Sequence, residues 1–150
     1  MARFYSPDDA NQLLPELTQV TARLRDEREE LVGLRDAYRR REAAVGGGAL
    51  VGPAPDSDRA EDDDELRRIR LRMRGIVDQM QAGVAWLDER EIMLRDIPTG
   101  LLDLPTQAGG RQVWLCWQLG EDAVGFWHTQ EEGFAGRLPL AYLDNGGDLA

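Results

Sequence analysis

Two apolar stripes, each spaced for an α-helix and separated by a glycine-rich stretch, constrain this chain more than any other feature of its sequence. In each stripe hydrophobic residues recur at intervals of three and four, so that one side of a helix is apolar over several turns. Two such helices joined by a short connection predict an antiparallel, coiled-coil-like helical hairpin. The stripes consist of Leu13, Leu17, Val20, Leu24, Leu31 and Leu34, followed by Leu66, Ile69, Met73, Ile76 and Met80.

The first helix is expected over residues 6–45. Ser6 can cap its N-terminus, and Pro7 suits the first helical position, where a backbone N–H has no partner within the helix. Pro15 lies inside the predicted helix and is expected to kink it or to hold its first turns apart from the rest, because proline lacks an N–H and its ring crowds the preceding turn.

Residues 46–60 contain glycines and prolines without an apolar period, which predicts a flexible loop. A second helix is predicted over 61–90 and begins with the acidic run Glu61–Glu65, which suits the positive end of a helix dipole. Two helices alone bury such stripes poorly. The pattern therefore favours a homodimer in which two hairpins form a four-helix arrangement.

From residue 92 to residue 140 the apolar period becomes alternating, which predicts a small antiparallel β-sheet of about three or four strands. A first strand over 100–104 is expected to end at Pro105, and residues 141–150 are expected to form a loose tail. The predicted fold class is therefore α+β, with a long helical hairpin followed by a small sheet, in a single domain over 1–150.

The strongest predicted strand, 112–119, is expected to pair with 123–129 through a tight turn. A three-residue turn places Cys116 opposite Phe126 and His128 opposite Trp114. Cys116 and His128 would then be diagonal neighbours on one face of the sheet.

Composition excludes several classes of protein. Every basic residue is arginine, so the chain has no lysine for a P-loop or a Schiff base. Its net charge of −10 argues against direct binding to nucleic acid. No apolar run approaches the roughly 18 residues of a membrane span, and a single cysteine cannot form an internal disulfide. We expect a cytoplasmic protein without membrane contact or a resident cofactor, unless a divalent metal is bound.

Several motifs, distributed along most of the chain, resemble a known family. Their residues are Phe4–Ser6 with Ala10–Leu17, Gly100–Pro105, Gly110–Arg111 with Val113, Leu115–Trp117 and Leu119–Asp122, and Trp127–His128 with Gly133–Arg137. Together these are similar to the bacterial domain-of-unknown-function 2203 family. The resemblance covers nearly the whole chain except residues 46–60 and the tail. It implies a small cytosolic bacterial protein and brings no established activity.

The polar residues of these motifs, Asp103, Cys116, Glu121, His128 and Arg137, form the candidate site. Cys116 and His128 are metal-ligand types, and Asp103 and Glu121 are the acidic residues close enough in the predicted sheet to complete a metal site. The alternative is a small buried cysteine and a hydrogen-bonded histidine without a metal. A Cys116 nucleophile is disfavoured, because burial within a strand would raise its pKa and the sequence shows no sign of an oxyanion hole.

Arg137 follows a glycine-containing loop. We expect it to form an ion pair with Glu121 or Asp103 that holds this loop against the sheet. A guanidinium group at this place could instead bind a phosphate or a carboxylate.

The sequence leaves three functions open. The first is a non-catalytic, dimerising protein-interaction module, since the chain has two clean apolar stripes and no complete catalytic constellation. The second is a metal-binding protein or metalloenzyme that uses Cys116 and His128. The third is an RNA-polymerase-associated factor with an acidic hairpin tip at residues 56–65. This last interpretation rests on a layout similar to that of the Gre-type transcript-cleavage factors, without their sequence motif.

Overall fold

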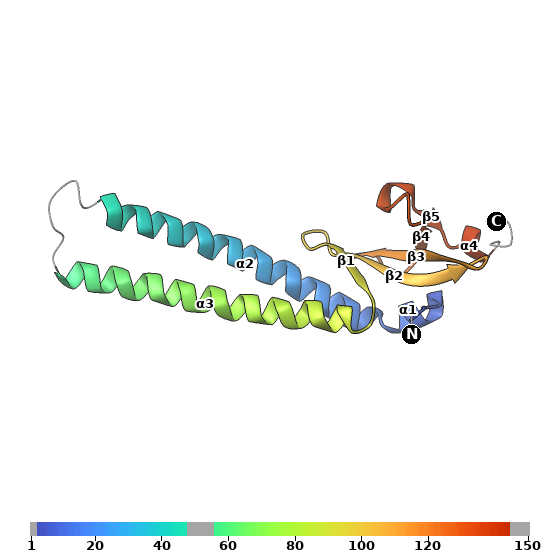
Figure 1. The fold of residues 1–150 in the computed structure, drawn as a ribbon, viewed down its shortest axis with the longest axis horizontal. Coiled ribbons are helices and arrows are strands. Elements are labelled where there is room, and N and C mark those ends of the chain that lie inside the picture. The colour runs from blue at the N-terminus through green and yellow to red at the C-terminus, as the bar shows by residue number, and fades with distance from the viewer. Residues whose placement is uncertain (1–2, 48–55, 145–150) are drawn as a thin grey trace. The chain divides into compact units, whose positions relative to one another are not determined.

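The computed structural model of the protein describes residues 3–47 and 56–144 and contains long helices and an antiparallel sheet, which confirms the predicted α+β class (Figure 1). The chain divides into two compact units. Unit 1 consists of the residues up to Arg25 and those from Gly83 onwards, and unit 2 consists of Asp26–Ala82.

Helix α1, Pro7–Gln12, begins with the predicted cap. The Ser6 hydroxyl accepts a hydrogen bond from the backbone N–H of Asp9 at 3.0 Å. The Asp9 carboxylate accepts one from the backbone N–H of Ser6 at 3.3 Å. This capping box satisfies two N–H groups at the start of the chain and fixes where the helix begins.

The single helix predicted over 6–45 is in fact two helices, because α1 is separated at Leu13 from α2, which spans Leu14–Gly47. Pro15 has no N–H to donate to the carbonyl four residues earlier, so regular helical hydrogen bonding cannot pass through this turn. Of the two expected effects of Pro15 the second is observed, because the first turns form the separate helix α1.

Helix α3, Asp56–Asp88, begins earlier than the predicted start at residue 61. Together with α2 it makes both ends of the predicted loop 46–60 helical, while residues 48–55 lie outside the described part of the chain. Asp56 and Asp58 extend the acidic start of α3, and acidic residues are favoured at the positive end of the helix dipole.

Helix α3 ends two residues before the predicted end at 90, because Glu91 adopts a left-handed conformation with φ 59°. The backbone N–H groups of Glu91 and Ile92 turn back to the carbonyls of Asp88 and Leu87, each at 3.0 Å. These two bonds form the closing turn that typically ends a helix, with glutamate where glycine is usual.

Unit 2 is the predicted helical hairpin, in which the described parts of α2 and α3 run antiparallel (Figure 1). Two ion pairs join the helices: Arg72 to Glu30 at 2.8 Å and Arg41 to Glu65 at 2.9 Å. Among the predicted stripe residues of this unit Ile76 is fully buried, and the others are half-buried. Those others are Leu31, Leu34, Leu66, Ile69, Met73 and Met80.

The sheet of unit 1 has five antiparallel strands in the order β1-β2-β3-β4-β5, rather than the three or four predicted. The additional strands are short and lie at the two edges of the sheet. Strands this short do not show a clear alternating pattern in the sequence. The strands are β1 Met93–Asp96, β2 Leu101–Ala108, β3 Arg111–Gln118, β4 Phe126–His128 and β5 Leu138–Pro139.

Strand β2 does not end at Pro105 as predicted but continues to Ala108, with Pro105 paired to Trp114 of β3. The carbonyl of Pro105 accepts a hydrogen bond from the backbone N–H of Tyr5 at 2.8 Å. In a strand the N–H and C=O of one residue point to the same side. The missing N–H of Pro105 therefore faces the Tyr5 segment and removes no bond to β3.

One face of the sheet forms the apolar core of unit 1. Side chains at alternating positions of β2, β3 and β4 are almost fully buried on this face. These residues are Leu102, Leu104, Val113, Leu115, Trp117 and Trp127. Helix α1 is fastened to the segment before β4 by Asn11, whose Oδ1 accepts a hydrogen bond from the Val124 N–H at 2.7 Å.

The end of the chain is more ordered than the predicted tail over 141–150. A short 3₁₀ helix, η2, spans Phe134–Gly136, and helix α4 spans Ala141–Asp144. The N–H of Leu140 donates to the carbonyl of Gly125 at 3.1 Å, which ties the segment before α4 to the sheet. Residues 145–150 lie outside the described part of the chain.

Candidate functional site

The face of the sheet opposite the apolar core carries a buried polar cluster. Asp103 on β2 lies directly opposite Cys116 on β3, and Cys116 lies opposite Phe126 on β4. His128 pairs with Trp114, so it lies two residues further along the same face. The register predicted for β3 and β4 is therefore confirmed, and β2 adds Asp103 from the third strand.

Asp103, Cys116 and His128, which we call the Asp–Cys–His cluster, bring three potential ligand atoms together. One atom from each side chain lies within 4.8 Å of the other two, and all three residues are buried. The side chains of Asp103 and His128 are only 4% and 3% exposed. A carboxylate, a thiol and an imidazole thus share one site shielded from water.

The hydrogen bonds of His128 restrict its protonation. Its Nδ1 lies 2.7 Å from the carbonyl oxygen of Thr129, which can only accept, so Nδ1 must carry a hydrogen. Its Nε2 lies 3.0 Å from Oδ1 of Asp103, which also accepts when ionised. One hydrogen therefore lies between Nε2 of His128 and Oδ1 of Asp103, in addition to the hydrogen on Nδ1.

Arg95 on β1 is a residue of the site that sequence reasoning missed. Its Nε donates to Oδ2 of Asp103 at 2.8 Å, and its guanidinium carbon lies 5.1 Å from the centre of the Trp114 ring. Arg95 lies within the region 92–140 that the alternating pattern predicts as sheet, but this pattern does not identify the neighbouring strand. The ion pair holds one oxygen of Asp103 and leaves the other directed at His128.

Arg137 forms the predicted ion pair with Glu121, with Nη1 donating to Oε1 at 3.0 Å. Its guanidinium carbon also lies 3.9 Å from the Phe126 ring centre and 4.4 Å from that of Phe134. Glu121 accepts a further bond from the N–H of Gln118 at 2.7 Å. Glu121 therefore anchors Arg137 and the turn after β3 and does not belong to the Asp–Cys–His cluster.

The environment of Cys116 keeps its thiol protonated. Burial, together with the smaller effect of the negative charge of Asp103, raises the pKa of Cys116 from its ordinary value of 9.0 to about 12, although Arg137 acts in the opposite direction. A thiol with this pKa is a poor nucleophile at neutral pH. The arrangement therefore favours a role for Cys116 as a metal ligand, whose thiol a bound metal ion deprotonates. It disfavours a role for Cys116 as a free nucleophile.

The third predicted function falls largely outside the described side chains. The acidic segment 56–65 lies at the start of α3, and the side chains of residues 56–62 are not described. Within the described part of the chain, no helix is long and apolar enough to cross a membrane. The homodimer and the cytoplasmic location stay predictions.

The fold and the site define a small α+β protein that combines a helical hairpin with an antiparallel sheet carrying a buried carboxylate–thiol–imidazole cluster. The chain belongs to the family described as "Uncharacterized conserved protein (DUF2203)", whose model matches residues 3–140. The matched region includes both long helices and the whole Asp–Cys–His cluster. No curated protein and no solved structure matches the chain.

Proposed function

We propose that this protein binds a transition-metal ion of the zinc class through Asp103, Cys116 and His128. The observation that carries the proposal is the convergence of the three ligand atoms within 4.8 Å of one another in a buried site. Zinc–ligand bonds of about 2.0–2.3 Å in a tetrahedron separate neighbouring ligand atoms by roughly 3.3–3.9 Å. Small side-chain adjustments would bring the cluster to these distances.

The charges of the cluster suit the exchange of protons for a metal ion. Without a metal, Cys116 keeps its thiol proton and one hydrogen lies between Nε2 of His128 and Oδ1 of Asp103, so the charges of the cluster sum to zero. A divalent ion bound to the carboxylate, the thiolate and the neutral imidazole also sums to zero. Metal binding would thus release two protons without adding net charge beside the guanidinium groups of Arg95 and Arg137.

Neighbouring groups orient the ligands as outer-shell partners do in metal sites. The Thr129 carbonyl fixes the hydrogen on Nδ1 of His128 and leaves Nε2 to bind the metal. Arg95 holds Oδ2 of Asp103 and leaves Oδ1 to bind it. Three protein ligands leave one position of a tetrahedral zinc site for water.

Elemental analysis of protein purified without an affinity tag tests this proposal. We expect about one metal ion per chain, a content that falls when the protein is purified at low pH because protons compete for the ligands. Cys116→Ser and His128→Gln should each abolish stoichiometric binding. Glu121→Gln is the matched control, because Glu121 lies near the cluster but outside it.

Titration with Co²⁺ provides a second readout. Binding through Cys116 should produce the near-ultraviolet thiolate-to-metal absorption, and Cys116→Ser should remove that band while Glu121→Gln keeps it. The proposal is wrong if native protein holds less than about 0.1 metal ion per chain and Co²⁺ produces no such band.

A second candidate function, a protein-interaction module, is favoured by the hairpin of unit 2. Its apolar stripe is only half-buried by the two helices, apart from Ile76. Exposed apolar surface of this kind is typical of interaction sites. Sedimentation at micromolar concentration tests the dimerising version, which predicts a dimer. A monomeric protein would exclude the dimer, and this surface could then bind only a different protein.

A further inference from the structure

We infer that one side of the unit 2 hairpin is a docking surface for an acidic amphipathic helix of a partner protein. This inference rests on the interaction-module function proposed above and names the chemistry of the partner. The inference follows from a difference between the two sides of the hairpin. The helical period of 100° per residue determines which residues lie on each side.

Ion pairs close the first side of the hairpin. Glu30 on α2 and Arg72 on α3 form a two-bond pair at 2.8 and 3.1 Å. The helical period places the other pair, Arg41 and Glu65, on the same side of the two helices. The charged side chains on this side of the hairpin are thus paired with one another between the two helices.

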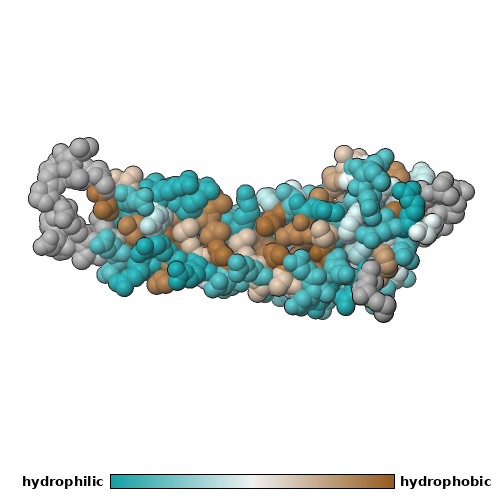
Figure 2. All heavy atoms as spheres, in the orientation of Figure 1, coloured by the Kyte–Doolittle hydropathy of each residue, from teal (hydrophilic) through white to brown (hydrophobic). Residues whose placement is uncertain are grey.

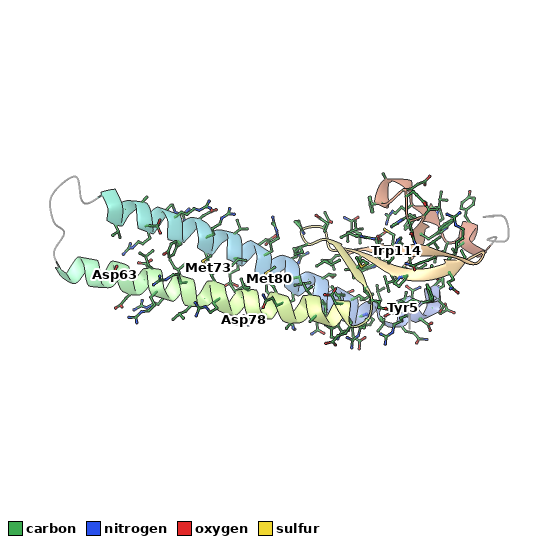
Figure 3. All side chains as sticks on the ribbon, viewed as in Figure 1. Tyr5, Asp63, Met73, Asp78, Met80 and Trp114 are labelled. Carbon is green, nitrogen blue, oxygen red and sulfur yellow. The ribbon has the colours of Figure 1, made fainter. Side chains whose placement is uncertain are left out.

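The second side of the hairpin, which we call the apolar–basic face, has no ion pair between the helices among the described residues. Hydrophobic side chains of α3 turn toward this face and remain half-buried or exposed, with Val77 38% exposed. Figure 3 shows Met73 and Met80 between the helices and Asp78 on the outer side of α3. The apolar residues of the face are Leu66, Met73 and Val77 on α3, with Leu31 and Val32 on α2.

The hydrophobic residues form a band rather than isolated points. Figure 2 shows hydrophobic residues between the two helices of the hairpin, with hydrophilic residues along their outer sides. An apolar band between two helices fits the apolar stripe of a third helix.

Arginines flank this band. Arg28 and Arg39 on α2 and Arg70 and Arg74 on α3 are exposed and lie on the apolar–basic face according to the helical period. None of the four forms an ion pair with another described residue.

The charge of the face selects the partner. A second copy of the chain packed through the same face would bring arginines toward arginines, because acidic residues are few on this side and include Glu42 and Asp63 near the loop. A helix with an apolar stripe and flanking carboxylates matches both the band and the unpaired guanidinium groups. The acidic amphipathic helix is therefore the occupant that the surface fits.

Two synthetic peptides test the inference. Both contain about three heptads with leucine at the core positions, and their flanking positions carry glutamate in one peptide and lysine in the other. Fluorescence anisotropy with the full-length protein should show binding of the glutamate peptide at least about tenfold tighter than that of the lysine peptide. The difference should decrease as salt is added.

Two charge-reversal variants locate the binding site. Arg70→Glu with Arg74→Glu should weaken binding of the glutamate peptide by about tenfold or more. Arg40→Glu with Arg68→Glu changes the net charge equally but lies away from the apolar–basic face, and it should change binding less than about twofold. Circular dichroism of both variants checks that the helices remain.

The possible outcomes separate the inference from the function on which it rests. Equal binding of the two peptides, or equal loss in the two variants, overturns the charge-based inference alone. A dimer in sedimentation that Arg70→Glu with Arg74→Glu dissociates shows that a second copy covers the face. Binding only to vesicles of anionic phospholipid shows a membrane surface instead. A monomer that binds neither peptide nor vesicles overturns the interaction-module function itself.

Discussion

Replacement of Arg137 by alanine should destabilise unit 1 substantially, because this side chain joins three separate segments. Its guanidinium group pairs with Glu121 in the turn after β3 and lies over the rings of Phe126 on β4 and Phe134 in η2. The Arg137 side chain is only 20% exposed, so water screens these contacts weakly.

The magnitude follows from these contacts. A partly desolvated cation–π contact is worth about 1 kcal/mol, and Arg137 makes two of them. A partly buried, charge-assisted hydrogen bond to Glu121 adds about 1 kcal/mol. The expected loss in free energy of unfolding is therefore about 3 kcal/mol, which corresponds to a fall in Tm of roughly 6–12 °C for a chain of this size.

Tryptophan fluorescence during urea unfolding is a suitable assay, because all four tryptophans of the chain lie in unit 1. Glu121→Gln removes the charge but keeps a hydrogen-bond acceptor, so its loss should be about 1 kcal/mol. Arg137→Lys keeps the charge and loses the planar group over the rings, so it should fall between the other two variants. A loss below about 1 kcal/mol for Arg137→Ala, or a loss for Glu121→Gln as large as that for Arg137→Ala, would refute the reasoning.

Two further predictions concern Cys116 and a pair of glycines. Burial raises the pKa of Cys116 in the folded chain from 9.0 to about 12, so the folded thiol keeps a proton that the unfolded thiol loses. The free energy of unfolding of metal-free protein should therefore fall as the pH rises from about 9 towards 12, and a similar decline in Cys116→Ala would contradict this. Gly100 has φ 67°, and an added Cβ would lie 2.5 Å from Cβ of Leu119. Gly100→Ala should therefore lose roughly 3 kcal/mol in urea unfolding, whereas Gly110→Ala, with φ 75° and open space, should lose only about 1 kcal/mol.

Local signals in the sequence were sufficient to predict those features of the fold that depend only on residues close together in the chain. The Ser6 cap and the effect of Pro15 follow from the chemistry of one or two residues, and both are present in the structure. The opposition of Cys116 and Phe126 was predicted from a three-residue turn. The register is as predicted, although the predicted partner strand 123–129 is shortened to β4 and residues 119–125 form the connection.

The full length of β2 depended on a long-range contact instead. The strand predicted to end at Pro105 continues, because the Tyr5 segment lies on the side where the proline N–H is missing. No local pattern indicates that a residue one hundred positions earlier in the chain lies beside Pro105. For the same reason, the pairing of Arg95 with Asp103 could not be read from either strand alone.

Glu121 shows the limit of reasoning from residue type. Its carboxylate and its place beside the strand made it a plausible ligand, but its direction depends on the turn geometry. The turn directs it to the Gln118 N–H and to Arg137. Side-chain direction, and not composition, decides which acidic residue joins the cluster.

The discontinuity of unit 1 has a consequence for the order in which the chain folds during synthesis. Residues up to Arg25 leave the ribosome early, but Pro105 and Val124, which bind Tyr5 and Asn11, follow only after the entire hairpin. The hairpin contacts are local in sequence and can form first. Once formed, the hairpin holds the two ends of unit 1 together, where Leu24 meets Gly83, and reduces the entropy lost on closing the long loop between them. Substitutions that weaken the hairpin should therefore slow the folding of the sheet, although they touch none of its residues.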